Sequence, residues 1–290
     1  MYDKILVPTD GSAAAGTAAE TALGLAQRFD ASLHAINVVE LNESPTDVES
    51  EVAEEITHRR EKTLATLRDR AADVGVSTAT QVIETADPVH QTIIDYARDH
   101  DVDLIVMGTH GRTGLNRLVL GSVTERTLRT SPVPVLTVHE DVPLDPDFET
   151  VLVPTDGSDP ANVAADHGIT FAEATGAAMH VVHAVDLTPL SGNFGSTEVL
   201  TALEEAGQRA VDDVIDRAED ADLRSVEASV LSGTPARAIL DYAEERDVDC
   251  IVMGTQGRTG LERYFLGSVT EKIVRVANVP VLTVSPPEGQ

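Results

Sequence analysis

The sequence carries one 18-residue segment twice. It reads LIVMGTHGRTGLNRLVLG at Leu104–Gly121 and CIVMGTQGRTGLERYFLG at Cys250–Gly267, 146 positions later. A second segment repeats at the same distance, because KILVPTDGS at Lys4–Ser12 returns as TVLVPTDGS at Thr150–Ser158. A period this long is typical of a duplicated domain and not of a short solenoid repeat.

The two copies are separated by a short acidic stretch that contains proline. It reads DVPLDPDFE at 141–149 and follows the segment PVLTV of Pro134–Val138, which recurs at Pro280–Val284. A connector of this composition is typical of a domain boundary. We therefore expect one domain over 1–140 and a second over 147–290.

Apolar runs alternate with helical patterns within each copy. In the first copy we expect strands near 4–9, 32–39, 78–83, 104–108 and 133–138. We expect helices near 13–29, 48–74, 89–99 and 122–130. Alternating strands and helices predict right-handed crossovers and an open parallel sheet with helices on both faces. The fold class is therefore α/β, with two tandem doubly wound, Rossmann-like domains, and ligands are expected where the strand order reverses.

Composition is consistent with such a sheet. Hydrophobic residues make up 42% of the chain but aromatic residues only 3%, so the core must consist mainly of Val, Ile, Leu and Ala. Cys250 is the single cysteine, which excludes an intramolecular disulfide and gives no sign of an oxidising compartment. No signal-like stretch precedes the first strand, and no apolar run approaches the ~20 residues of a membrane helix. We expect a soluble, cytoplasmic protein that does not bind membranes.

The chain is strongly acidic, with 49 acidic and 21 basic residues and a net charge of −28. Only Lys4, Lys62 and Lys272 are lysines. An acidic, lysine-poor surface is typical of halophilic proteins, whose self-repulsion is screened by concentrated salt. The same surface argues against nucleic acid as a partner, because phosphate binding requires clustered Lys and Arg.

A regular glycine spacing follows the fourth expected strand of each copy. Two residues separate Gly108 from Gly111, nine separate Gly111 from Gly121, and Ser122 comes next. The second copy has the same spacing at Gly254, Gly257, Gly267 and Ser268. Such glycines would adopt positive φ and let backbone amides approach phosphate oxygens at the start of a helix. The alternative is a turn followed by a capping box, Ser122 to Glu125 and Ser268 to Glu271, in which serine satisfies the helix's own amides.

The segment after the first strand adds a carboxylate to the same edge of the sheet. Asp10 would accept hydrogen bonds from a ribose hydroxyl or a base amine, or hold a metal-bound water. The alternative is an Asx turn leading into a helix capped by Ser12. In the second copy we expect Asp159 as the cap and Pro160 as the first helical residue.

One arginine follows the middle glycine of the spacing in each copy. Arg112 and Arg258 would each pair with phosphate through a planar guanidinium fork. A salt bridge to a neighbouring acid is the alternative in so acidic a chain.

Other candidate sites are weaker. Asp99, Asp101 and Asp103 begin like a calcium loop, but Leu104 replaces its glycine. His180 and His183 should face opposite sides of a strand, and Cys250 should be a small core residue. There is no GxxxxGK[ST] loop and no assignable pair of base and nucleophile, so the catalytic residues are unknown.

These motifs resemble the universal stress protein family in both copies, over nearly all of the chain. The ATP-binding members carry the same glycine spacing, followed by Ser or Thr. The resemblance implies a five-stranded parallel sheet in each domain that binds ATP, or another adenine nucleotide, and hydrolyses it slowly at most. No residue is assigned to a metal, and any Mg²⁺ would enter with the nucleotide phosphates. By the match, the residues around the ligand are Pro8, Thr9, Asp10, Val38, Met107, Gly108, Gly111, Arg112, Gly121, Ser122, Val123 and Thr124, and in the second copy Pro154, Thr155, Asp156, Ala184, Met253, Gly254, Gly257, Arg258, Gly267, Ser268, Val269 and Thr270.

The resemblance also implies that the two domains pair through their last strands, over 133–138 and 279–284. A tandem chain would form this dimer within itself, and two chains could pair further as a homodimer. Replacement of His110 by Gln256 and of Val38 by Ala184 could give the two sites different affinities. Three functions stay open: an ATP-binding stress-response or signalling protein, a slow ATPase or nucleotide-dependent enzyme, and a nucleotide-free interaction protein.

Overall fold

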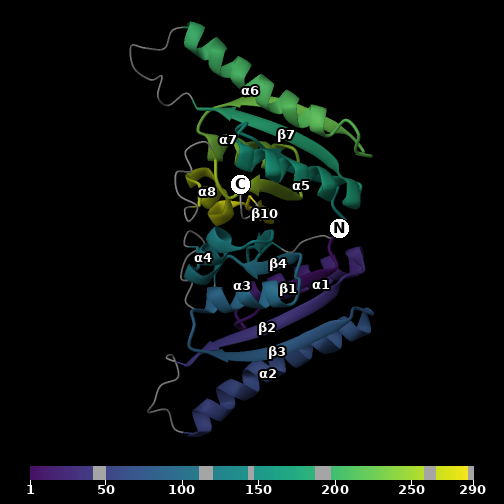
Figure 1. Cartoon of the computed structure of the whole chain (residues 1–290), viewed down its shortest axis with the longest axis vertical. Coiled ribbons are helices and arrows are strands. Elements are labelled where there is room, and N and C mark those ends of the chain that lie inside the picture. The colour runs from purple at the N-terminus through teal and green to yellow at the C-terminus, as the bar shows by residue number, and fades with distance from the viewer. Residues whose placement is uncertain (42–49, 111–119, 143–146, 187–196, 258–265, 287–290) are drawn as a thin grey trace. The chain divides into compact units, whose positions relative to one another are not determined.

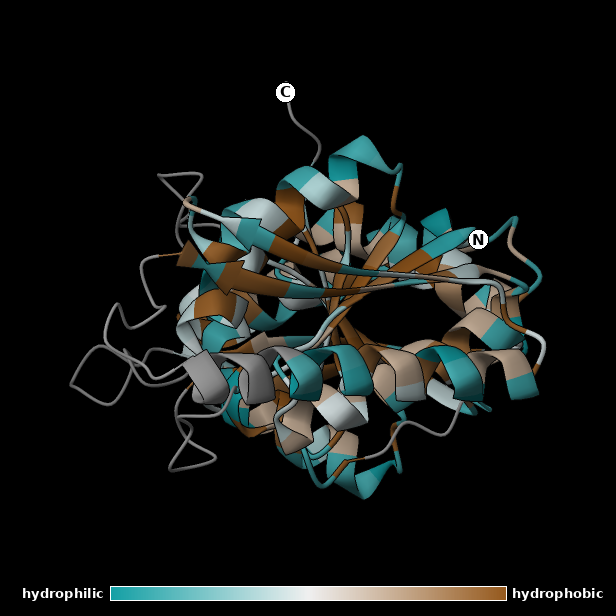
Figure 2. Ribbon diagram, turned by 90° about the horizontal axis from the view of Figure 1, so that it is seen from below, coloured by the Kyte–Doolittle hydropathy of each residue, from teal (hydrophilic) through white to brown (hydrophobic). Residues whose placement is uncertain are grey.

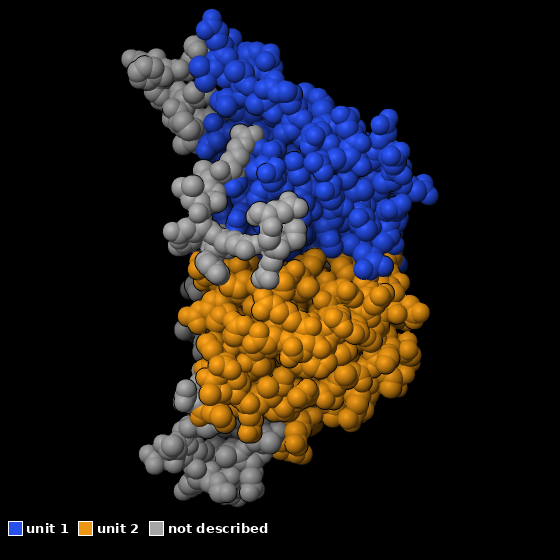
Figure 3. Space-filling view, in the orientation of Figure 1, with its two compact units in different colours: residues 1, 147–290 blue, residues 2–146 orange. Residues whose placement is uncertain are grey.

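The protein divides into two compact units, Tyr2–Pro146 and Asp147–Gln290 with Met1 (Figure 3). The computed structural model describes residues 1–41, 50–110, 120–142, 147–186, 197–257 and 266–286, and over 50–57 the backbone alone. The units are considered separately below.

Each unit is a five-stranded parallel sheet with four helices in its described part (Figure 1). The first unit contains β1 (Lys4–Pro8), α1 (Ala13–Phe29), β2 (Ser32–Glu40), α2 (Ser50–Asp73), β3 (Thr78–Thr85), α3 (Val89–Asp99), β4 (Leu104–Gly108), α4 (Ser122–Thr130) and β5 (Val135–Val138). The second contains β6 (Thr150–Pro154), α5 (Asp159–Thr175), β7 (Ala178–Val185), α6 (Thr197–Arg217), β8 (Val226–Ser232), α7 (Pro235–Glu245), β9 (Cys250–Gly254), α8 (Ser268–Val276) and β10 (Val281–Val284).

The strand order is that of a doubly wound sheet. It is β3-β2-β1-β4-β5 in the first unit and β8-β7-β6-β9-β10 in the second. The chain moves outward from β1 to β3 and then crosses back to β4, so right-handed crossovers place α1 and α2 on one face and α3 and α4 on the other. The predicted fold class is therefore confirmed.

The element boundaries follow the sequence pattern closely. The expected strand at 104–108 and the helices at 13–29, 89–99 and 122–130 are confirmed. The last strand of the first unit begins at Val135 and not at 133. Its start is delayed because the Val133 amide and carbonyl both bond to the Ser131 hydroxyl, and Pro134 has no amide hydrogen to donate.

The core is aliphatic, as the composition predicts. β4 and β9 are buried along their whole length, and Figure 2 shows mainly hydrophobic strands covered by helices of mixed polarity. Fully buried side chains include Ile5, Leu6, Ile105 and Leu136. Among the helices of the described ranges, none is both long enough and apolar enough to cross a membrane.

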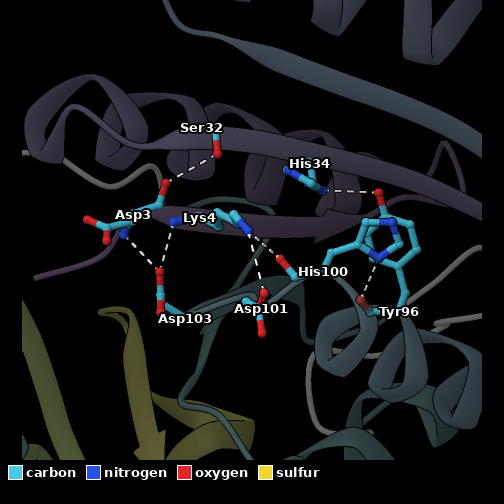
Figure 4. Close-up of polar contacts among 8 residues, drawn as sticks. All are labelled: Asp3, Lys4, Ser32, His34, Tyr96, His100, Asp101 and Asp103. Atoms are coloured by element: carbon cyan, nitrogen blue, oxygen red, sulfur yellow. Dashed lines mark hydrogen bonds and ion pairs between the residues drawn. The ribbon is translucent and has the colours of Figure 1, made fainter.

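At the amino edge of the sheet, Asp103 joins β1 to the start of β4 (Figure 4). Its Oδ2 accepts hydrogen bonds from the backbone amides of Asp3, at 2.8 Å, and Lys4, at 2.9 Å. Asp249 makes the equivalent pair of contacts with Glu149 and Thr150 in the second unit. The aspartate run at 99–103 therefore contributes a structural clamp at this edge.

Candidate functional site

The strand order reverses between β1 and β4, which are paired in register through Ile5 and Leu104. β1 continues into α1 on one face of the sheet, whereas β4 leads to α4 on the other. The residues after both strands therefore lie at the crevice where doubly wound sheets bind ligands. Repetition of the topology gives the second unit an equivalent crevice between β6 and β9.

Asp10 forms an Asx turn directly after β1. Its Oδ1 accepts a hydrogen bond from the Ser12 amide at 2.9 Å, Gly11 has a φ of 79°, and the Ser12 side chain caps α1 through Ala15. This is the structural alternative that the sequence left open. The turn fixes the carboxylate at the edge of the sheet.

The second copy corrects one prediction about this turn. The cap of α5 is Ser158, whose hydroxyl accepts from the Ala161 amide, and Asp159 is the first helical residue. The carboxylate of Asp156 bonds to both the amide and the hydroxyl of Ser158, and these bonds hold Ser158 at the cap position. Asp159 is therefore an acid in the first turn, where it complements the helix dipole.

The loops after β6 and β9 meet at Gly257. A Cβ atom added to Gly257 would lie 2.6 Å from Oδ2 of Asp156, so any other residue would displace this carboxylate. The structure thus brings together two of the motifs that the sequence placed at one site. Gly111, Arg112 and Arg258 lie outside the described residues.

The first motif glycine is required by close packing. A Cβ atom on Gly108 would lie 2.8 Å from the backbone carbon of Ala14, and on Gly254 it would lie 3.0 Å from the carbonyl oxygen of Pro160. The expectation of positive φ is wrong for the motif glycines that the structure describes, since none of them is among the residues with positive φ. These glycines provide space and not an unusual backbone conformation.

The helix after each motif begins at its last glycine. Gly121 is the N-cap of α4 and Gly267 is the N-cap of α8, and neither helix has a hydrogen bond from a capping side chain. The capping-box alternative is therefore wrong, because Ser122 and Ser268 are the first helical residues. Gly121 is held in place by its own amide, which donates to the Thr109 carbonyl at 2.8 Å. The first-turn amides are left without a side-chain cap, which is the arrangement that binds anions.

Thr124 and Thr270 connect these helices to the preceding strands. Their hydroxyls donate 2.8 Å hydrogen bonds to the carbonyls of Gly108 and Gly254. Both side chains are buried, so these threonines can offer a ligand their backbone amides but not their hydroxyls.

The remaining expected residues line the same edge. β2 extends beyond the end of β1, since Pro8 pairs with Ile36, and Val38 is half-buried two positions further on. Ala184 has the same position in the second unit, where Pro154 pairs with Val182. Thr9, Met107, Thr155 and Met253 are buried.

Sequence reasoning missed a side chain that supports the turn after β1. The Asn37 amide donates to the Thr9 carbonyl at 2.6 Å, and His183 Nδ1 contacts the Thr155 carbonyl at 2.9 Å. It also missed the contacts of His110 with Thr109, although replacement of His110 by Gln256 was a visible signal. Asn37 and His183 form no sequence motif with these turns, because each contacts a residue 28 positions away at the end of a neighbouring strand.

The weaker candidates have other roles. His180 Nδ1 contacts the Tyr242 hydroxyl at 3.2 Å, whereas His183 bonds to the loop after β6, so the two imidazoles have different surroundings. Burial raises the pKa of the Cys250 thiol to about 12, which excludes a thiolate nucleophile at neutral pH. No cluster of three potential metal ligands occurs in the described ranges.

The fold and the site define a class, the Rossmann-like α/β domains with a glycine-led helix at the switch point. Within it, the model of the universal stress protein family matches residues 1–139 and 147–285. The chain therefore belongs to the universal stress protein family, in a tandem form.

Individual relatives agree with this assignment. A universal stress protein of Methanocaldococcus jannaschii is 40% identical over 146 residues, which cover 49% of this chain and 85% of the relative. A universal stress protein of Thermus aquaticus is 41% identical over 140 residues, covering 47% of this chain and 98% of the relative. A solved universal stress protein structure from Archaeoglobus fulgidus is 26% identical, with a TM-score of 0.72 and coverage of 97% of this chain and 98% of that chain.

Proposed function

We propose that each repeat binds one adenine nucleotide, with ATP as the preferred ligand, and that the protein acts as a stress-response or signalling module. One observation carries the proposal: α4 and α8 each begin at a glycine, without a side-chain cap, at the switch point of the sheet. Phosphate groups would accept hydrogen bonds from the amides of Ser122 and Val123, and of Ser268 and Val269, aided by the helix dipole.

The backbone conformation of these caps supports a role in ligand binding. Gly121 and Gly267 have φ values of −63° and −58°, which any residue adopts. A Cβ atom on Gly267 would make ordinary contacts, the nearest at 3.4 Å from the Thr255 carbonyl oxygen. Since neither strain nor packing requires glycine at 267, space for an approaching phosphate is the better explanation.

The other end of the ligand would lie toward β1 and β2. Asp10 and Asp156 offer carboxylates to ribose hydroxyls or a base amine, and Val38 and Ala184 offer apolar contact to the base. The negative charge of the protein does not prevent this, because concentrated salt screens the distant charges while the amides act locally. Magnesium would be held through the phosphates. Pairing of the two repeats through their last strands is part of the same proposal and rests on the family resemblance.

Mass spectrometry of the purified, denatured protein tests the proposal. We expect adenine nucleotide to be released from the wild-type chain but not from the Gly121→Val, Gly267→Val double variant. Because bound ligand can be lost in purification, ATP is then added back and binding is measured by calorimetry. A folded wild-type chain that neither releases nucleotide nor binds added ATP would overturn the proposal in favour of a nucleotide-free interaction protein.

A further inference from the structure

At the end of β4 in the first unit, one hydroxyl group contacts two imidazole rings. Oγ1 of Thr109 lies 2.9 Å from Nδ1 of His110 and 3.0 Å from Nδ1 of His139, and the two rings are 5.8 Å apart between centroids. Thr109 and His139 are buried, whereas His110 is half-buried. The buried pair Thr109 and His139 thus orients His110, which is more accessible to a ligand.

The chemistry of a hydroxyl couples the two rings. A threonine hydroxyl has one hydrogen to donate, so between two neutral imidazoles it donates to one Nδ1 and accepts from the other. When His110 carries its proton on Nδ1, its Nε2 has a free lone pair and can act as a base. A proton taken up at Nε2 can then be shared, because the Nδ1 hydrogen of His110 can pass to Thr109 while the Thr109 hydrogen passes to His139.

The cluster is anchored at the start of α4. Thr109 also accepts the hydrogen bond from Gly121, the N-cap of α4, through its carbonyl. The residue that holds the proposed phosphate-binding helix therefore also orients His110, which follows it directly in the chain. A base that is held in orientation by a hydrogen-bonded neighbour is a recurring feature of sites that activate a nucleophile.

The second unit retains the hydroxyl but lacks both bases. Thr255 occupies the position of Thr109 and contacts the hydroxyl of Ser285 at 3.2 Å, and Ser285 replaces His139. Gln256 replaces His110. Gly267 still donates to the Thr255 carbonyl at 2.8 Å, so the helix start is the same in both units. The two sites thus share a phosphate cradle and differ in proton-accepting groups.

From this difference we propose that the first site hydrolyses ATP with His110 as general base, while the second site only binds it. The inference rests on the proposed function. In the step, a water oxygen bonds to the γ-phosphorus and the bond from that phosphorus to the β,γ-bridging oxygen breaks. The water proton goes to His110 Nε2, and ADP leaves with the electron pair of the broken bond. Thr109 and His139 act as positioning residues.

Single-turnover hydrolysis of γ-labelled ATP tests the inference in the Gly267→Val background, in which the second site is blocked. We expect His110→Gln, which installs the residue of the second unit, to slow hydrolysis ~100-fold or more, the usual contribution of a general base. ATP affinity, measured separately by calorimetry, should change less than about threefold. Thr109→Ser should retain hydrolysis and Thr109→Val should lose it, with folding checked by circular dichroism.

A gain of function provides the converse test. In a Gly121→Val background, Gln256→His together with Ser285→His should give the second site measurable hydrolysis, and Gln256→His alone should give less. Bound ATP that the first site does not hydrolyse, or hydrolysis unchanged in His110→Gln, would overturn the inference while leaving the proposed function intact. Absence of ATP binding in the wild-type chain would instead refute the proposed function.

Discussion

The hydroxyl of Thr124 donates a 2.8 Å hydrogen bond to the carbonyl of Gly108, which ties the first turn of α4 to the last residue of β4. Thr270 and Gly254 repeat this contact at the same distance in the second unit. Each contact fixes the start of a helix against the strand at the switch point. The position of the proposed phosphate cradle therefore depends on a buried side-chain bond as well as on its glycines.

Removal of this bond should destabilise the first unit. Thr124→Val keeps the shape of the side chain but leaves the buried Gly108 carbonyl without its threonine donor, which costs about 1–3 kcal/mol in the free energy of unfolding. Thr66→Val is the matched control, since its exposed hydroxyl donates to the Lys62 carbonyl within α2. Urea denaturation in concentrated salt measures both, and an equal effect of the two variants would contradict the role given to Thr124.

A methyl group at Gly108 should also destabilise the protein. In Gly108→Ala the new Cβ would lie 2.8–2.9 Å from atoms of Ala14, so α1 or β4 must shift, at a cost of about 1–3 kcal/mol. Gly16→Ala, near the start of α1 where a new Cβ would have no atom within 4 Å, should instead stabilise by roughly 0.5–1 kcal/mol. Thermal unfolding of the two variants distinguishes the expected loss of stability from the expected gain. A Gly108→Ala variant as stable as Gly16→Ala would be incompatible with the close packing of Gly108 against Ala14.

Acid should weaken the second unit through His167. Burial lowers the pKa of His167 in α5 from 6.5 to about 4. The folded chain then binds fewer protons than the unfolded chain between these pH values, so stability is lost as the pH falls from 6.5 to 4, by up to about 3 kcal/mol.

Comparison with His167→Gln isolates this contribution from the many carboxylates. The difference in unfolding free energy between wild type and variant should shrink or change sign in favour of the variant as the pH falls. His58→Gln, which replaces an exposed histidine of α2, is the matched control for the substitution itself. A constant difference between wild type and His167→Gln from pH 7 to 4.5 would refute the assignment.

Low salt should unfold or expand the protein. With a net charge of −28, self-repulsion extends over a screening length of about 10 Å at 0.1 M salt but only about 3 Å at 1 M. We expect helical circular dichroism to fall on dialysis from molar potassium chloride to ~0.05 M. An uncharged osmolyte at equal osmolality should not restore it, and an unchanged spectrum at low salt would show that the acidic surface is tolerated without screening.

The alternation of apolar strands and amphipathic helices was sufficient to predict the fold. The run Leu104–Gly108 has no polar side chain, as expected for a strand covered by helices on both faces of the sheet. The same pattern at 250–254 supported this interpretation. Residues without such periodicity were predicted less well. Sequence alone could not choose between Gly121 and Ser122 as the cap, because the bond from Gly121 to the Thr109 carbonyl decides it.

Only those parts of the site that are formed by residues close together in the sequence could be predicted. The Asx turn at Asp10 lies within three residues and was foreseen as one alternative. The grouping of Thr109 with His139 was not, since these residues are 30 positions apart and meet only because β4 and β5 are neighbours.

The number of ATP molecules bound per chain tests the central claim most directly. Calorimetric titration in concentrated salt should give two for the wild type, one for Gly121→Val or Gly267→Val alone, and none for the double variant, because a valine side chain would cover the first-turn amides of α4 and α8. A folded double variant that binds ATP with the affinity and stoichiometry of the wild type would contradict the claim that these amides hold the phosphates.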